Sequence, residues 1–243
     1  MWWNNLFENM SSTSFFNFSF LPAYAGYFLQ GLAYTLLLAV VSVALAVIPA
    51  LLLALMRLSK NKFIKSISGA YIALFRSTPL LVQLSIIYFG LFGVISIPRV
   101  TILGFVDLSR FIPGVVALAL NSSAYVAEIF RAGILAVDKG QTEAGRSLGL
   151  SAWTTMRLIV LPQALKNVLP ALGNEFISLL KETSIVGYIA IVDLTKAAGL
   201  VRARTFDAFF PLICVALVYL ALVLLLSAVQ KRLERRMRES DRK

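Results

Sequence analysis

The chain has 243 residues, of which 59% are hydrophobic and 14% charged, and its mean hydropathy is +0.82. These values exclude a soluble domain and indicate an integral membrane protein. The net charge of +11 does not indicate nucleic-acid binding, because most basic residues lie in loops and in the tail, where membrane proteins keep them. The chain has no histidine and one cysteine, Cys214, which excludes a disulfide framework and a thiol metal site.

The first half of the chain contains three predicted membrane spans. Residues 1–27 are aromatic and lack Lys and Arg, so we interpret them as an extracytoplasmic segment at the membrane surface rather than a cleaved signal peptide. The apolar run 29–56 is the first span, and the basic stretch RLSKNKFIK follows it. The second span, 66–97, contains the sequence RSTP, and because proline disfavours helix before it, we expect a break near Thr78 that leaves Arg76 near the cytoplasmic end. After a loop over 98–110, the third span runs over about 111–130.

The second half contains a polar insert and two further spans. The insert covers 138–166, and the fourth span, 168–192, is interrupted by Asn, Glu, Ser, Lys and Thr side chains. Three central charges would cost roughly 8 to 10 kcal/mol in lipid, so these side chains should face protein or water. A loop over 193–206 precedes the fifth span, 209–229, and the basic tail, 231–243.

Charge distribution predicts how these spans are oriented. Sixteen of the 23 basic residues lie in the first loop, the insert with its flanks and the tail, and five lie in the other two loops. The positive-inside rule therefore places the amino terminus outside and the insert and carboxyl terminus inside. We predict an all-α, multi-pass protein of the cell membrane with five transmembrane helices.

The insert reads as two short helices separated by a tight break. Gly140 is expected to break the chain before the first helix, Glu143 to lie in its first turn, and Gly149 to terminate it. Ser151 is expected to cap the second helix. Ala144 and Gly145 would leave a surface with little side chain, and Leu148 and Leu150 offer apolar contacts, as in a helix that docks into a partner's groove. An amphipathic helix resting on the membrane explains the same residues, so both interpretations stay open at this point.

A family resemblance covers about residues 28–230. Glu143-Ala144-Gly145, three residues, Gly149, nine residues, Ile159, one residue and Leu161-Pro162 resemble the EAA loop of membrane subunits of ABC importers, with Gly145 in place of the second alanine. FRSTPLLVQL, ALNSSAYVAEIFRAGI and LGNEFISLLKETS are similar to blocks of the polar amino-acid permease family, of the histidine, glutamine and arginine type.

The resemblance implies a type I importer fold, with the insert as a coupling helix seated in a cytoplasmic ATPase subunit. The residues expected to make this contact are Glu143, Ala144, Gly145, Leu148, Gly149 and Leu150. ATP and Mg would be bound by that ATPase, because this chain contains no GxxxxGK[ST] phosphate loop and is expected to bind no cofactor or metal itself. The resemblance also implies an extracytoplasmic substrate-binding protein and a second permease subunit, identical or related, and alternating access of a polar amino acid, with a basic amino acid or glutamine favoured.

Candidate substrate contacts lie mainly in the fourth span, where polar residues recur at helical spacing. They are Asn174, Glu175, Ser178, Lys181 and Glu182. The resemblance implies that the acidic ones receive an amino group or cationic side chain; ion pairs between subunits would explain them as well. Weaker candidates are Arg76, Ser77, Thr78 and Gln83 at the break, and Asn121 and Ser122 in the third span, where packing and interhelical hydrogen bonds are the alternatives.

Two other classes of function remain to be separated from this one. An ion-coupled secondary amino-acid transporter would also use Glu175, Lys181 and Glu182, although the chain shows no pair of similar halves. A membrane scaffold would need the docking insert without the charged span.

Overall fold

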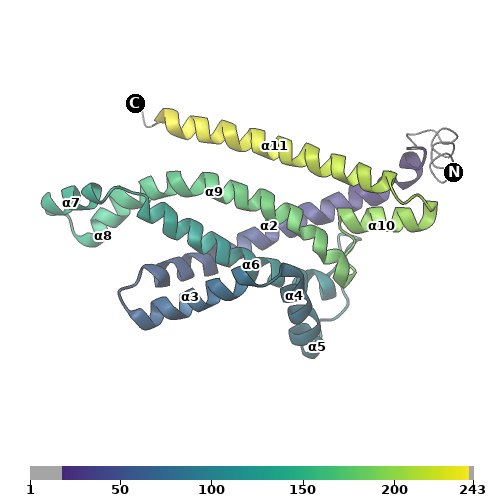
Figure 1. Ribbon diagram of the computed structural model, residues 1–243, viewed down its shortest axis with the longest axis horizontal. Helices are drawn as coiled ribbons and strands as arrows, with labels where there is room; N and C mark the ends of the chain where they lie inside the picture. Colours follow the sequence, from purple (N-terminus) through teal and green to yellow (C-terminus); the bar gives the residue numbers. More distant parts are fainter. Residues whose placement is uncertain (1–17, 241–243) are drawn as a thin grey trace, which may run out of the picture.

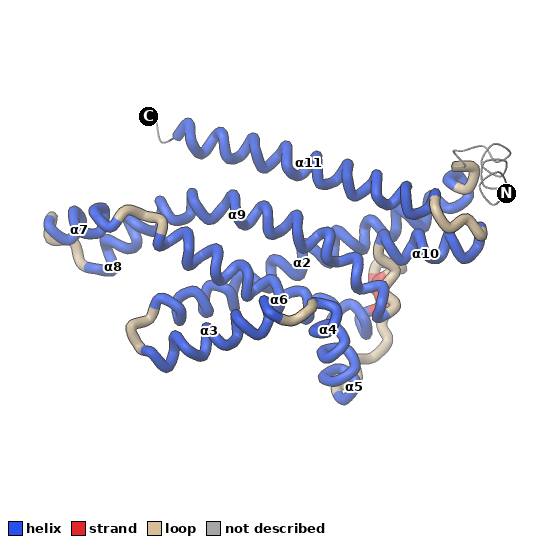
Figure 2. Tube along the Cα trace, in the orientation of Figure 1, coloured by secondary structure: helices blue, strands red, loops and turns tan. Residues whose placement is uncertain are grey.

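A computed structural model describes residues 18–240, so most of our predicted extracytoplasmic segment lies outside the described residues. The described chain is helical except for short connections and two strands (Figures 1 and 2). The longest helices lie roughly along the long axis of the molecule, with α7 and α8 at one end and α10 at the other (Figure 1).

The first span is a single long helix, α2, Leu21–Leu58. It starts eight residues before the predicted apolar run, so residues 21–28 belong to the helix. Ala46, Ala50 and Ala54 recur every fourth residue on its buried face and let α6 pack closely. Gly31 lies so near the start of α10 that an added Cβ would be 2.8 Å from the Asp193 carbonyl oxygen, which explains why this position carries glycine.

The second span is broken, as the RSTP sequence predicts. Helix α3, Lys62–Ser77, ends at Thr78-Pro79, and α4, Leu80–Ser85, continues at an angle of 104° through a π-helical turn, Ile86–Leu91, into α5, Phe92–Val94. Arg76 occupies the last turn of α3, about 20 Å from the end marked by the basic loop at 1.5 Å per residue. The proline break ends α3 just after Arg76, and the position of Arg76 near the cytoplasmic end of the membrane stays a prediction.

The loop before the third span is a small antiparallel hairpin, β1 Thr101–Ile102 and β2 Val106–Asp107. Helix α6, Leu108–Leu135, follows at once and is longer at both ends than predicted. The Asp107 carboxylate caps it by accepting hydrogen bonds from the Ser109 backbone N–H at 2.9 Å and the Ser109 hydroxyl at 2.6 Å. The hydroxyl hydrogen bond is the main reason why the pKa of Asp107 is lowered.

The insert forms a helical hairpin. Helix α7, Lys139–Ser147, is capped by Asp138, and Gly140 is already its second residue, so the predicted break at Gly140 was wrong. Glu143 is the fifth residue and lies beyond the first turn, which also differs from our expectation. Gly149 ends the hairpin's first helix with φ of +81°, where L side chains are strained, as predicted.

The second helix of the hairpin does not stop within the insert. Ser151 caps α8, Ala152–Thr155, as expected, by accepting a hydrogen bond from the Thr154 backbone N–H at 3.1 Å. A π-helical turn, Met156–Val160, then joins α8 to α9, Leu161–Glu182, without a loop. The hairpin is therefore rooted in two membrane helices, α6 and α9.

The fourth span ends earlier than predicted, and the predicted loop over 193–206 is mostly helix. A 3-10 helix, Thr183–Ile189, follows α9, and α10 occupies Leu194–Thr205. The Asp193 carboxylate caps α10 by accepting hydrogen bonds from the Thr195 and Lys196 backbone N–H groups, both at 3.0 Å. We did not predict this cap, because the polar composition of the stretch indicated a loop. Helix α11, Phe210–Ser240, covers the fifth span and continues through the predicted tail to the end of the described residues.

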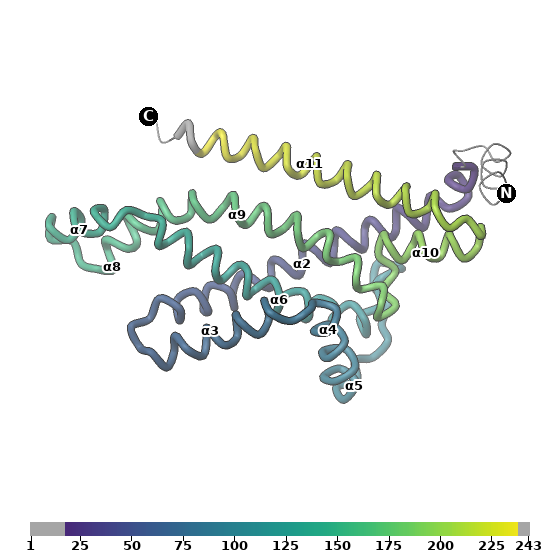
Figure 3. The backbone as a smooth tube through the Cα atoms, in the orientation of Figure 1, coloured from purple at the N-terminus to yellow at the C-terminus, as the bar shows by residue number. Residues whose placement is uncertain are grey.

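The two ends of the bundle carry different segments. The α2–α3 connection, the insert and the last turns of α11 lie at one end (Figure 3), whereas the strands and α10 lie toward the other (Figure 2). The three most basic segments thus share one end, as the charge distribution predicts. Three described helices are long and apolar enough to cross a membrane, or five spans result if each bent helix pair counts as one.

Candidate functional site: a polar pocket and a helical hairpin

A pocket of about 520 Å³ lies among α3, α6 and α9 in the half of the bundle nearer the insert. Its charged and polar lining residues are Arg76, Tyr125, Glu128, Asn167 and Glu175. The Arg76 guanidinium lies over the Tyr125 ring, 5.2 Å from the ring centroid, and the Glu175 carboxylate accepts a hydrogen bond from the Ser122 hydroxyl at 3.0 Å. A cation and a carboxylate from different helices therefore share one cavity, which can receive a small molecule that carries both charges.

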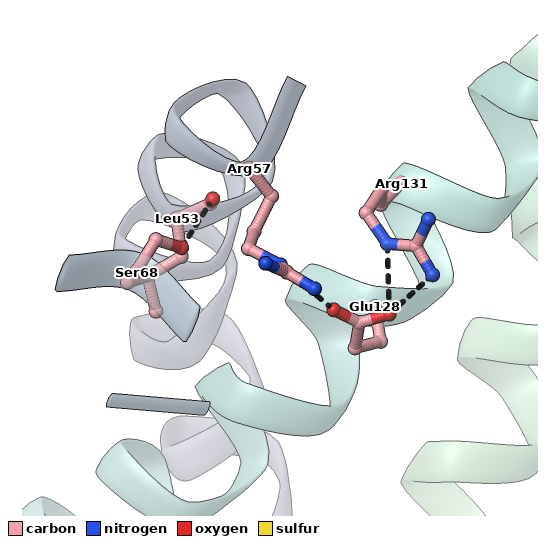
Figure 4. Close-up of polar contacts among 5 residues, drawn as sticks. All are labelled: Leu53, Arg57, Ser68, Glu128 and Arg131. Atoms are coloured by element: carbon pink, nitrogen blue, oxygen red, sulfur yellow. Dashed lines mark hydrogen bonds and ion pairs between the residues drawn. The ribbon is translucent and has the colours of Figure 1, made fainter. Parts of the chain in front are cut away.

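Glu128, at one side of the pocket, is held by two arginines. Arg131 contacts one carboxylate oxygen through Nε at 2.8 Å and Nη2 at 2.7 Å, and the Arg57 Nε lies 3.6 Å from the other oxygen (Figure 4). Glu128 and Arg131 thus form a local i, i+3 pair on α6. Arg57 comes from the end of α2, so the cluster also joins α2 to α6 close to the insert.

The broken second span is stabilised by an amide network. The Gln83 side-chain NH2 donates to the Phe75 carbonyl at 2.8 Å and the Thr78 carbonyl at 3.0 Å, and Asn121 donates to the Gln83 side-chain oxygen at 2.9 Å. These bonds satisfy backbone acceptors that the break leaves without helical partners. Thr78, Gln83 and Asn121 thus stabilise the break, in line with the alternatives of packing and interhelical hydrogen bonds. Ser77 is exposed beside Arg76.

The predicted polar stripe on α9 does not act as one surface. Glu175 lines the pocket and Asn174 instead accepts a hydrogen bond from Gln230 of α11 at 3.2 Å. Ser178 is half-buried, and Lys181 and Glu182 are exposed at the other end of α9, outside the pocket lining. Helical spacing places these residues on a helix face, but it does not show which of them are covered by neighbouring helices.

Sequence reasoning missed three pocket residues, because Tyr125, Glu128 and Asn167 were not among the predicted substrate contacts. A signal was present, because Asn121, Tyr125 and Glu128 recur at i, i+4 and i+7 and so share one face of α6.

The hairpin presents an exposed apolar surface. Leu148 is 81% exposed, Trp153 72% and Leu158 62%, and Ala144 and Glu143 are also exposed, while Leu150 is partly covered. Gly145 points inward instead: an added Cβ would lie 2.9 Å from the Ile159 Cδ1 and the Thr155 Cγ2. The prediction that Gly145 leaves an open surface was wrong, because this residue lets α7 pack against the second helix of the hairpin. Trp153 and Leu158 were not predicted.

Fold and site together define a multi-pass helical membrane protein with a polar pocket beside a broken span and a helical hairpin at one end. Residues 46–239 match the family described as binding-protein-dependent transport system inner membrane component, and the chain belongs to this family.

Relatives and solved structures agree with this assignment. The chain is 43% identical over 215 residues to the arginine transport system permease protein ArtQ of Bacillus subtilis, covering 88% of this chain and 94% of the relative. It is 40% identical over 211 residues to GlnP of Rickettsia typhi, named as a permease protein of a glutamine transport system, covering 87% and 93%.

A chain from the crystal structure of an amino acid ABC transporter with histidines is 45% identical, with a TM-score of 0.82 and coverage of 91% of this chain and 99% of that chain. The resemblance to polar amino-acid permeases is thereby confirmed, as is the helical fold of importer permeases.

Proposed function

We propose that this chain is the permease subunit of an ATP-driven importer of a polar amino acid, with a basic amino acid or glutamine as the favoured substrate. Its relatives are named for arginine and glutamine transport, and a similar solved chain belongs to an amino acid transporter. The single observation that carries the proposal is the shared pocket of Arg76 and Glu175, which offers opposite charges to a zwitterion.

The pocket suggests how an amino acid is held. Arg76 pairs with the α-carboxylate, since a guanidinium presents several donors in a fork that matches a carboxylate. Glu175 receives the α-ammonium group or a cationic side chain, and Ser122 orients the Glu175 carboxylate. The roles predicted for Asn174, Ser178, Lys181 and Glu182 remain part of this proposal, as contacts outside the pocket.

The hairpin is the proposed contact with a cytoplasmic ATPase subunit. Its exposed apolar residues, Leu148, Trp153 and Leu158, and the exposed Glu143 and Ala144 would enter a cleft of that subunit. ATP and Mg are bound there and not by this chain. A substrate-binding protein would deliver the amino acid on the other side, and a second permease subunit would complete an alternating-access pathway.

The two alternative functions, an ion-coupled transporter and a membrane scaffold, have less support. An ion-coupled transporter is not favoured, because the family is one of binding-protein-dependent systems. A scaffold does not need opposite charges in one pocket.

The test is uptake and ATPase activity of the complex reconstituted in liposomes with its ATPase and binding protein, over a panel of arginine, lysine, histidine, glutamine and leucine. We expect at least one polar amino acid to stimulate ATP hydrolysis and enter the vesicles, and leucine to do neither. Glu175→Gln should reduce uptake without loss of the bound ATPase. Ion-driven uptake without ATP, or no stimulation by any polar amino acid, would refute the proposal.

A further inference from the structure

An apolar groove of about 560 Å³ lies between α9 and α11 on a different face of α9 from the polar pocket. Gln230 of α11 bridges the two helices by donating to the Pro170 carbonyl at 2.9 Å and to the Asn174 side-chain oxygen at 3.2 Å. The two helices are therefore held at a fixed separation, and the groove is a property of the folded chain.

The groove changes from apolar to basic along its length. Its deep end is lined by Phe176, Ile177 and Leu226, within the predicted membrane spans, and its other end by Lys166 and Arg236, beyond or at the span ends. The rise along α9 from Lys166 to Ile177 is about 16 Å, close to half of a ~30 Å hydrocarbon core. The groove thus crosses from the hydrocarbon of one leaflet into its headgroup region.

We propose that this groove binds one anionic phospholipid of the leaflet on the insert side, with an acyl chain at the Phe176 end and the headgroup at Lys166 and Arg236. Basic side chains at the membrane surface attract anionic lipid headgroups, and the apolar end accepts a hydrocarbon chain. Glu234, the single acidic residue among the described lining residues, accepts a hydrogen bond from Gln230 at 3.0 Å, and Lys166 and Arg236 together outweigh its one negative charge.

Charge complementarity favours lipid over a second copy of the chain. A copy meeting this groove across a two-fold axis would bring its own Lys166 and Arg236 near the same basic end, where like charges repel. The exposed Lys231, Arg232 and Arg235 on the same turns of α11 increase that repulsion and strengthen attraction to an anionic leaflet.

The test uses the full-length chain in neutral detergent, titrated with palmitoyl-oleoyl phosphatidylglycerol or phosphatidylcholine, with retained lipid counted by native mass spectrometry. We expect one phosphatidylglycerol to be retained in preference to phosphatidylcholine. The double variant Lys166→Gln, Arg236→Gln should weaken this binding roughly 25-fold, at roughly fivefold for each cation. The matched control Lys231→Gln, Arg235→Gln removes the same charge outside the groove lining and should weaken lipid binding much less than the groove variant does.

A second variant tests the apolar end without changing charge. Val229→Trp places a large side chain in the groove and should displace the lipid, while the thermal unfolding midpoint without lipid reports whether the variant folds. The proposal is overturned if both double variants lose lipid equally, if phosphatidylcholine is retained as well as phosphatidylglycerol, or if the groove variants abolish a chain dimer and leave lipid binding unchanged.

Discussion

The hydroxyl of Ser122 on α6 donates a hydrogen bond to the carboxylate of Glu175 on α9, at 3.0 Å, across the helix interface that borders the polar pocket. This bond fixes the direction of a charged group that lipid would not tolerate. The charge can be removed at Glu175 and the hydrogen bond at Ser122, so the effects of the two on transport and stability can be measured separately.

Removing the charge of Glu175 should impair transport more than stability. In Glu175→Gln the amide oxygen still accepts from Ser122, but the negative charge offered to an ammonium group is lost. Uptake at low substrate concentration should fall about tenfold or more, as expected for loss of one charged interaction. Transport assays in proteoliposomes measure this, with Glu234→Gln, on α11 outside the pocket lining, as the comparison. An equal effect of both changes would argue against the pocket as the point of contact.

Removing the hydrogen bond alone should impair stability more than transport. Ser122→Ala leaves the Glu175 charge in place but without its donor, at a cost of about 1 to 3 kcal/mol. We expect a lower thermal unfolding midpoint in detergent and a raised apparent KM, with Ser122→Thr, which keeps the hydroxyl, restoring part of both. A neutral result for Ser122→Ala would mean that the bond does not orient the carboxylate.

Glu128 should be more important for stability than either arginine that it contacts. Glu128→Gln leaves the guanidinium groups of Arg57 and Arg131, each about one-third exposed, facing each other without a carboxylate between them. The expected loss is about 1.5 to 3 kcal/mol, measured as a drop in the thermal unfolding midpoint. Arg131→Gln is the milder control, because Glu128 keeps its contact with Arg57. A larger loss in the control than in Glu128→Gln would contradict this assignment.

The α7 packing depends on the missing side chain of Gly145. Gly145→Ala, which restores the alanine of the EAA pattern, should push α7 away from Thr155 and Ile159, at a cost of about 1 to 3 kcal/mol that a gain of about 1 kcal/mol in helix propensity offsets in part. The ATPase subunit should co-purify less well as a result. Adding Ile159→Val removes the Cδ1 methyl 2.9 Å from the new Cβ and should recover part of the association. Failure of that second change to help would place the defect elsewhere.

Gln83 should be intolerant of apolar replacement. Gln83→Leu removes the donor to the Thr78 carbonyl and the acceptor for Asn121, and it leaves the Phe75 carbonyl with only the Asn121 amide at 3.3 Å, at a cost of about 1 to 3 kcal/mol. Thermal unfolding in detergent measures the loss. Ser85→Ala, which removes only a hydroxyl bonded to Leu81 on the same helix turn, is the control and should be nearly neutral.

Local signals in the sequence predicted the local features of the fold. Pro79 predicted the break after α3, Gly149 the end of α7, and Ser151 the cap of α8, because each acts through its own backbone or its nearest neighbours. Whether a glycine faces outward, as expected of Gly145, or inward, as found, depends on a helix ten residues further along the chain. Sequence alone could not decide this.

Tertiary arrangement decided the rest of the site. Arg76 and Glu175 are separated by about a hundred residues, and only the bend between α3 and α4 and the packing of α6 between α3 and α9 bring them to one pocket. Helix α10 escaped prediction for a related reason: its composition is polar, and it is held by the Asp193 cap and by Ala197, Ala198 and Val201, which are buried in the fold.

The π-helical turn at Met156–Val160 sets the angle between the hairpin and the pocket. Because the turn joins α8 to α9 without a loop, Trp153 and Glu175 lie on one continuous helical segment. A π-helical turn closes its hydrogen bonds over five residues rather than four and so holds one residue more than an α-helical turn. Inserting one residue into the regular helix after this turn would rotate Trp153 by about 100° relative to Glu175, so that the hairpin and the pocket could not both keep their present directions.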